Sequence, residues 1–165
     1  YPLPEAQLDR FMFLIRMEYP SRDEEISIAQ QTTTGTLPKL KKVISGKQLR
    51  DFQQLVERVP VPDHGHELAV DLVRRTRPNE EESPAWLKRL VQWGAGPRAI
   101  QYLIKGAKAR AVLSGNYMTS MEDVEAVADP VLFHRILTNF HARSEGVTST
   151  EVVKRLIEDA RKEQR

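Results

Sequence analysis

The chain has 165 residues, of which 40% are apolar and 29% are charged, as in ordinary globular proteins with a hydrophobic core. It contains no cysteine, which excludes disulfides, thiolate nucleophiles and cysteine-ligated metal sites and fits a cytoplasmic location. The net charge of +2, from 25 basic and 23 acidic residues, is too balanced to favour a nucleic-acid binder. No apolar run approaches the roughly 20 residues of a transmembrane helix, so no membrane span is expected.

The first 20 residues differ from the rest of the sequence. A polar turn leads into the apolar run Phe11 to Ile15, which is typical of a strand buried on both faces of a parallel sheet. The rest of the chain offers no partner strands for such a sheet. We therefore expect residues 1–20 to be the end of an α/β core. We also expect the chain, which opens at Tyr1 without methionine, to be a piece of a longer protein.

From residue 21 onward the pattern is helical, and an all-α domain of about eight helices is predicted for residues 21–165. Capping boxes, in which a Ser or Thr pairs with a Glu or Gln three residues later, predict four of the helix starts. The four boxes are Ser21 with Glu24, Ser45 with Gln48, Thr119 with Glu122, and Thr148 with Glu151.

Proline and glycine indicate further boundaries among these helices. An extended piece over residues 37–44 separates the first two helices, and Ser83 followed by Pro84 predicts another start. Gly96 and Pro97 open the most regular helix of the chain, which is predicted to end near Gly115. A further helix is predicted to start at Pro130.

The sequence contains no phosphate-binding loop. Such a loop needs the pattern G-x-x-x-x-G-K-[ST], because its glycines let backbone amides wrap the phosphates. The pair Gly46 and Lys47 fails on both sides, since Lys41 takes the place of the first glycine and Gln48 follows the lysine. These residues alone are therefore not expected to hydrolyse ATP.

The four histidines do not form a metal motif. His64 and His66, beside Asp63, are two apart at a helix start and point in different directions, so we interpret them as part of a solvated turn. His134 and His141 are interpreted as core or surface histidines. We predict no metal site.

Two arginines are candidates for phosphate recognition. Arg10 lies where the polar turn enters the apolar run, and an ion pair with Asp9 or Glu5 is the alternative interpretation. Arg98 lies in the first turn of the helix that follows Gly96, where the helix dipole disfavours a cation but free amides favour a bound anion. For Arg98 the alternative is a solvent-exposed side chain with a distant carboxylate partner.

The positions of these arginines match a known family. The run from Tyr1 to Phe11, with Leu8-Asp9-Arg10-Phe11 at its end, resembles the segment after the sensor-1 strand of MoxR-type AAA+ ATPases. The stretch from Gly96 to Arg110, with Gly96-Pro97-Arg98-Ala99 at its start, resembles the sensor-2 helix of that family. Shorter matches continue to the run Val131-Leu132 with His134-Arg135, so the resemblance covers nearly the whole chain.

The resemblance implies a role for each arginine. Arg10 corresponds to the arginine finger, which acts in trans on ATP bound by a neighbouring subunit of a ring, commonly a hexamer. Arg98, with Pro97 and Gly96, corresponds to sensor 2, which contacts the ATP phosphates in its own subunit. ATP and Mg²⁺ are implied for the full-length protein, with its own N-terminal AAA+ core, neighbouring subunits and a von Willebrand factor A domain protein as partners. The family is implied to be chaperone-like.

Two other functions are compatible with the residues alone. The first is a helical protein–protein interaction module in which Arg10 and Arg98 contact acidic partner surfaces. The second is a nucleic-acid binder that uses Arg74-Arg75, the segment from Lys39 to Lys42 and the C-terminal Lys-Glu-Gln-Arg, which the balanced charge disfavours.

Overall fold

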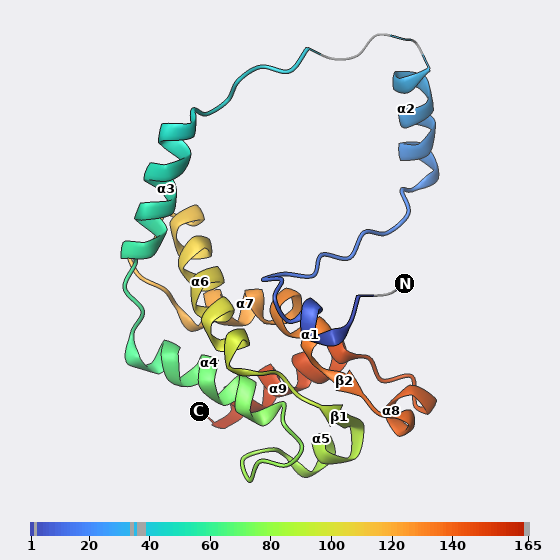
Figure 1. The fold of residues 1–165 in the computed structure, drawn as a ribbon, viewed down its shortest axis with the longest axis vertical. Helices are drawn as coiled ribbons and strands as arrows, with labels where there is room; N and C mark the ends of the chain where they lie inside the picture. Colours follow the sequence, from blue (N-terminus) through green and yellow to red (C-terminus); the bar gives the residue numbers. More distant parts are fainter. Residues whose placement is uncertain (2, 34, 36–38, 164–165) are drawn as a thin grey trace.

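The computed structural model describes residues 1, 3–33, 35 and 39–163, and the chain is mostly helical, as predicted, at 63%. Over these residues the elements follow in the order shown in Figure 1. They are α1 (Glu5–Leu8), α2 (Arg22–Thr32), α3 (Gly46–Arg58), α4 (Asp63–Arg75), α5 (Ala85–Leu90), β1 (Val91–Trp93), α6 (Pro97–Leu113), α7 (Met121–Leu132), the 3-10 helix η1 (Phe133–Arg135), β2 (Leu137–Thr138), α8 (Phe140–Ser144) and α9 (Ser149–Glu163).

The hydrophobic core lies between α4, α6, α7 and α9. Helices α6 and α7 pack closely against each other, with α4 and α9 against them (Figure 1). Each of these four helices buries one apolar face, so side chains from distant parts of the sequence meet in one core. The largest fully buried side chains are Leu72, Leu87, Leu103, Leu132 and Leu156.

A two-stranded antiparallel sheet closes one end of this helical body. Val91 pairs with Thr138 and Trp93 with Leu137, and an irregularity in register lies between the two pairs. The sequence analysis did not predict these short strands. With two or three residues each, they are below the length at which alternation of apolar and polar residues gives a signal.

Helices α2 and α3 lie outside the core. Figure 1 shows α2 apart from the helical body, and none of its residues is buried. Helix α3 contacts α6, yet its apolar residues Leu49, Phe52 and Leu55 remain about half exposed, at 48%, 49% and 49%. This part of the chain therefore carries apolar surface that the described residues leave uncovered.

The predicted buried strand at residues 11–15 is wrong for this structure. No strand forms there, and Phe11 and Ile15 are exposed at 56% and 73%. The physical reason is the lack of neighbouring strands: in this stretch the Leu14 amide donates to the Pro130 carbonyl at 2.9 Å instead of joining a sheet. The segment lies along the helices. The ring of Phe13 lies against Gly106, where an added Cβ would stand 3.3 Å from its Cζ atom.

Three of the four predicted capping boxes are confirmed, and one is displaced. Ser21 and Ser45 cap α2 and α3, and Thr148 exchanges hydrogen bonds with Glu151 at the start of α9. At α7 the box is one residue later than predicted, because Ser120 pairs with Asp123. The hydroxyl of Thr119 is buried and makes no hydrogen bond to the described residues, and Ser120 is the N-cap.

The predicted starts at Ser83 and Pro130 are wrong in detail. Pro84 is the N-cap of α5, because the Ser83 hydroxyl turns back to the Arg77 carbonyl. Pro130 lies inside α7, two residues from its end, where a missing amide removes only one helical hydrogen bond. Leu37 and Pro38 of the predicted extended piece lie outside the described residues; residues 39–43 form no helix or strand.

Helix α6 begins and ends as predicted. Gly96 is its N-cap and Pro97 its first residue. At the other end Gly115, with φ of 74°, donates to Val112, and Asn116 donates to Ala111 at 2.8 Å. These two bonds form a Schellman motif, which requires a residue that adopts positive φ at low cost.

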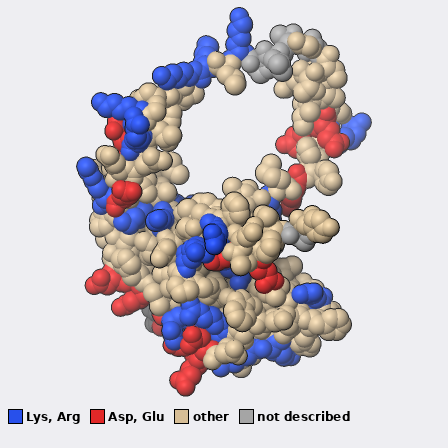
Figure 2. Space-filling view, in the orientation of Figure 1, with Lys and Arg blue, Asp and Glu red and all other residues tan. Residues whose placement is uncertain are grey.

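The charged residues do not form a single-sign surface. Both signs are scattered over the face shown in Figure 2. Arg74 pairs with Glu80 and Glu82, and Arg75 pairs with Glu163, so this basic dipeptide is matched by acidic partners. Within the part of the chain that the structure describes, no helix combines the length and apolarity needed to cross a membrane.

The core assignment predicts a large difference between two leucines of α6. Leu103 is fully buried and Leu113 is 89% exposed, so Leu103→Ala should lower the free energy of unfolding by about 2–5 kcal/mol. Leu113→Ala is the matched control, since it is the same substitution in the same helix, and should change it by less than about 0.5 kcal/mol. Urea unfolding of both variants measures this, and equal losses would contradict the assignment.

Candidate functional site

The approach to α6 is fixed by the end of α4. The Thr76 hydroxyl donates to Val73 at 2.6 Å and accepts the Ala95 amide at 2.9 Å, and Arg77 donates to the Ala95 carbonyl at 2.9 Å. Gly94 lies so close that an added Cβ would stand 2.3 Å from the Thr76 oxygen. Only glycine permits this close approach of the two backbone segments. The approach fixes the position of the start of α6.

Arg98, in the first turn of α6, forms an ion pair with Asp9. The two residues are 89 positions apart, and the Arg98 side chain is 42% exposed. This is the distant carboxylate that the alternative interpretation of Arg98 anticipated. Because the guanidinium is half in solvent beside the N-terminal amides of a 17-residue helix, it remains within reach of an added anion.

Asp9 is shared between two arginines. One carboxylate oxygen faces Arg98, and the other accepts from Nε of Arg135 at 3.0 Å. The Arg135 side chain is 1% exposed, whereas Asp9 is 31% exposed. One carboxylate thus faces two guanidinium groups, and the cluster keeps a net positive charge that suits an anionic ligand.

Arg135 also binds the main chain around Arg10. It donates to the carbonyls of Asp9 and Phe11 at 2.7 and 2.6 Å and lies 3.4 Å from that of Met12. The carbonyl of Arg10 itself accepts from the Tyr102 hydroxyl at 2.9 Å. Four consecutive carbonyls, from residue 9 to residue 12, are therefore bound by side chains of α6 and η1.

The Arg10 side chain has a different environment from its main chain. It is exposed, and among the described residues it has no hydrogen bond or ion pair. The predicted alternative, a pair with Asp9 or Glu5, is not formed, because Asp9 is engaged by Arg98 and Arg135. The structure thus presents a free guanidinium on a fixed stretch of backbone.

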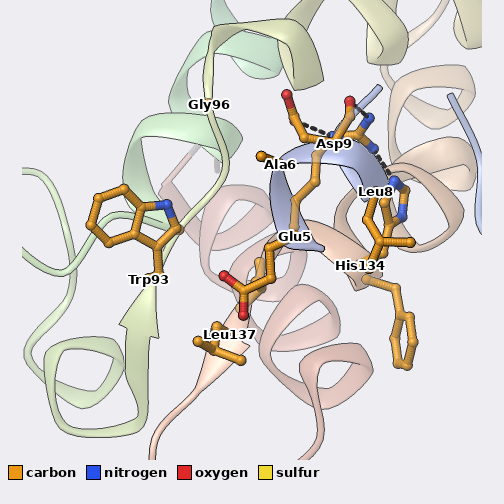
Figure 3. Close-up of a pocket in the computed structure, with 12 residues that line it drawn as sticks. Glu5, Ala6, Leu8, Asp9, Trp93, Gly96, His134 and Leu137 are labelled. Atoms are coloured by element: carbon orange, nitrogen blue, oxygen red, sulfur yellow. Dashed lines mark hydrogen bonds and ion pairs between the residues drawn. The ribbon is translucent and has the colours of Figure 1, made fainter. Parts of the chain in front are cut away.

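A cavity of about 570 Å³ adjoins this cluster. It lies between α1, β1 and η1, with Glu5 and Asp9 on one side and Trp93 on the other (Figure 3). Gly96 lies at its edge, so the cavity reaches the start of α6. Its lining combines apolar surface with the acidic side chains of Glu5 and Asp9.

Burial affects the ionisable groups of the cluster. Desolvation lowers the pKa of Arg135, while its hydrogen bond and charge interaction with Asp9 act in the opposite direction. Burial, followed by the positive charge of Arg135, lowers the pKa of His134. Nε2 of His134 lies 2.6 Å from the Arg135 guanidinium and 3.1 Å from the carbonyl oxygen of Phe11, and the first contact would bring two positive charges together if the imidazole were protonated.

The other candidate residues lie elsewhere. His64 and His66 are exposed on the first turns of α4, and Gly46 and Lys47 form the start of α3. Among the described residues no group of three or more His, Asp or Glu is arranged to hold a metal ion.

The sequence analysis missed three residues of the cluster: Asp9 as a bridge, Tyr102 and Arg135. A signal existed for Arg135, which follows the apolar pair Val131 and Leu132 and precedes Ile136. An arginine within an apolar run is expected to be buried and to need a carboxylate partner. Nothing in the spacing, however, indicates that this partner is Asp9, 126 residues earlier.

The lowered pKa of His134 gives a pH dependence of stability. Its pKa is below the ordinary value of 6.5 in the folded state, so the unfolded chain binds a proton more readily. The stability that neutral His134 contributes is present above pH 6.5 and is lost as the pH falls towards the lowered folded value. His134→Gln should therefore make the fall in unfolding free energy between pH 7 and pH 5 shallower.

Urea unfolding at several pH values measures this effect. The same substitution at the exposed His64 is the matched control for the loss of one imidazole. An equally steep fall with and without His134 would show that its burial does not affect stability.

The chain is similar to several known proteins. Residues 85–156 match the model of the AAA lid domain family. The chain is 34% identical over 158 residues to the uncharacterised protein YeaC of Bacillus subtilis, covering 95% of this chain and 47% of YeaC. It is 32% identical to the chaperone MoxR1 of Mycobacterium tuberculosis, covering 96% of this chain and 42% of MoxR1.

A solved structure shares the fold. A Cytophaga hutchinsonii protein described as a "putative ATPase" superposes with a TM-score of 0.87 at 27% identity, over 96% of this chain and 48% of that one. The chain thus spans about half the length of the relatives it matches. The lid-domain match, the MoxR relatives and the shared fold together identify the chain as belonging to the MoxR-type AAA+ ATPases, of which it matches the part that carries the lid.

Proposed function

We propose that this chain supplies two arginines to the ATP sites of a ring-forming, chaperone-like AAA+ ATPase. Arg10 acts in trans, on ATP held by a neighbouring subunit, and Arg98 acts in cis, on the phosphates of ATP in its own subunit. The observation that carries the proposal is the contrast between the main chain and the side chain at Arg10. The four carbonyls of residues 9–12 are bound by side chains of α6 and η1, whereas the Arg10 guanidinium has no partner among the described residues. An arginine that is held by its main chain and free at its side chain can reach a group on a neighbouring subunit.

The chemistry of each arginine differs. A guanidinium at the γ-phosphate stabilises negative charge that develops during phosphoryl transfer, so Arg10 would act on turnover. Arg98, at the start of α6 with Gly96 and Pro97, would act on nucleotide binding, because it joins a charge to free backbone amides. The AAA+ core would supply the phosphate-binding loop and hold the Mg²⁺, since the sequence of this chain contains no such loop.

The exposed apolar surface supports a neighbouring core. Phe11, Ile15 and Met17 are more than half exposed, at 56%, 73% and 88%. We propose that residues 1–20 complete the AAA+ core and that residues 21–165 form the lid domain. The partners would be the N-terminal core, adjacent subunits of a hexamer and a von Willebrand factor A domain protein, in the cytoplasm.

A helical interaction module without a nucleotide role remains the second candidate. The half-exposed Leu49, Phe52 and Leu55 of α3 favour it, because an apolar helix face is a common docking surface. The two functions differ in what the arginines do. In an interaction module neither arginine would affect ATP turnover in the full-length protein.

Arg10→Ala in the full-length ATPase should reduce kcat by on the order of 10³-fold and leave ATP affinity unchanged. The reason is that a finger acting in trans contributes to the transition state and little to ground-state binding. Steady-state phosphate release and nucleotide titration measure the two quantities. Arg50→Ala, at an exposed arginine of α3 outside the cluster, is the matched control; normal turnover by Arg10→Ala would reject the finger.

Arg98→Ala should weaken ATP binding by about 10- to 100-fold, because a charge-assisted hydrogen bond contributes about 1.5–3 kcal/mol. Titration of the full-length protein with a non-hydrolysable ATP analogue and Mg²⁺ measures the affinity. Arg110→Ala is the control within the same helix, since Arg110 pairs with Asp123 at 3.3 Å near its other end. Unchanged affinity in Arg98→Ala would reject the sensor role.

A further inference from the structure

We propose that Arg135 is a positioning residue for Arg10, and that Asp9 links this positioning to the occupancy of Arg98 by phosphate. The inference rests on the proposed function of the two arginines and adds a physical connection between them. It assigns roles to three residues, Asp9, Tyr102 and Arg135, that bind the segment around Arg10.

Arg135 binds the main chain on both sides of Arg10. Its side chain is 1% exposed and donates to the carbonyls of Asp9 and Phe11, which flank Arg10 on both sides. Its guanidinium lies over the Tyr102 ring at 5.1 Å, and the Tyr102 hydroxyl binds the carbonyl of Arg10. A planar group with five donors can bind several carbonyls at fixed angles, whereas a lysine ammonium cannot reproduce that pattern.

The buried charge of Arg135 is compensated by Asp9. A buried guanidinium loses hydration, and neutral carbonyls offset only part of that loss. The carboxylate that pairs with it is Asp9, at 3.0 Å. The residue next to Arg10 thus supplies both a carbonyl and the compensating negative charge, so a change at Asp9 alters the hold on Arg10.

Asp9 and a bound phosphate would compete for the guanidinium of Arg98. The Asp9 oxygen that does not face Arg135 faces Arg98, and this pair is partly exposed, with side chains 31% and 42% accessible. A phosphate that binds Arg98 takes the same guanidinium and places negative charge beside Asp9. The Asp9 carboxylate then pairs with Arg135 alone. Nucleotide bound in one subunit therefore changes how firmly that subunit's own Arg10 segment is bound, and Arg10 is the residue that reaches the neighbouring subunit.

This coupling is reciprocal, as any linkage between two binding equilibria must be. If phosphate displaces Asp9 from Arg98, then removal of the Asp9 charge must favour phosphate. A residue that only stabilised the fold would not strengthen nucleotide binding when it was replaced. The direction of the affinity change therefore separates the link from a merely structural role.

The test uses the full-length ATPase with Asp9→Asn, Tyr102→Phe and Arg135→Lys. Asp9→Asn should bind a non-hydrolysable ATP analogue with Mg²⁺ about two- to fivefold more tightly, the range expected for a partly exposed ion pair, and should turn over more slowly. Tyr102→Phe, which removes one hydroxyl, should lower kcat about fivefold with unchanged affinity. Arg135→Lys should lower kcat further.

Glu125→Gln is the matched control for Asp9→Asn. It removes a carboxylate that pairs with Arg161 across α7 and α9 and does not touch residues 9–12. Its kcat and affinity should equal those of the wild type. If Arg135→Lys does not fold, Tyr102→Phe carries the test of positioning, since it removes a hydroxyl and keeps the ring under Arg135.

Three results would overturn the proposal. They are unchanged or weaker nucleotide binding in Asp9→Asn, unchanged kcat in Tyr102→Phe, and changes in Glu125→Gln as large as those in Asp9→Asn. Failure of the proposed function is distinguishable, because Arg10→Ala would then turn over normally. If Arg10→Ala is inactive while Asp9→Asn and Tyr102→Phe behave like the wild type, the finger stands and only the link is wrong.

Discussion

A buried guanidinium is the constraint on which the arrangement of this chain depends. Arg135 is placed by the turn after α7 in an apolar environment, where an unpaired charge would be costly. It is satisfied by residues 9–12, which belong to the other end of the chain. The N-terminal segment is thus held on the helical body by a polar anchor, although its apolar residues Phe11 and Ile15 remain largely exposed.

The same anchor brings together the two arginines that the sequence singled out. Arg98 lies at the start of α6 because Gly94 and Thr76 fix the approach to that helix, and Asp9 joins it to the segment that carries Arg10. In the proposed function the two guanidiniums serve different ATP molecules, one in the same subunit and one in the next. The shared carboxylate of Asp9 would then connect these two sites through its contacts with Arg98 and Arg135.

Sequence patterns predicted the local features and missed the distant contacts. Capping boxes at Ser21 and Ser45 and the glycine ends of α6 are short-range signals, and they were confirmed. The strand predicted from the apolar run at residues 11–15 does not form, because a strand needs partners, and without them the run lies along the helices. Arg10 and Arg98 were identified as candidates, whereas the bridge through Asp9 could not be, because it joins residues 89 and 126 positions apart.

The most direct test of this account is a structure of the full-length ATPase ring with a non-hydrolysable ATP analogue and Mg²⁺. The account predicts that Arg98 contacts a phosphate oxygen in its own subunit, that Arg10 contacts the γ-phosphate held by the neighbour, and that Arg135 still binds the carbonyls around Arg10. A structure with nucleotide bound in which Arg98 remains paired with Asp9 and Arg10 faces solvent would contradict it.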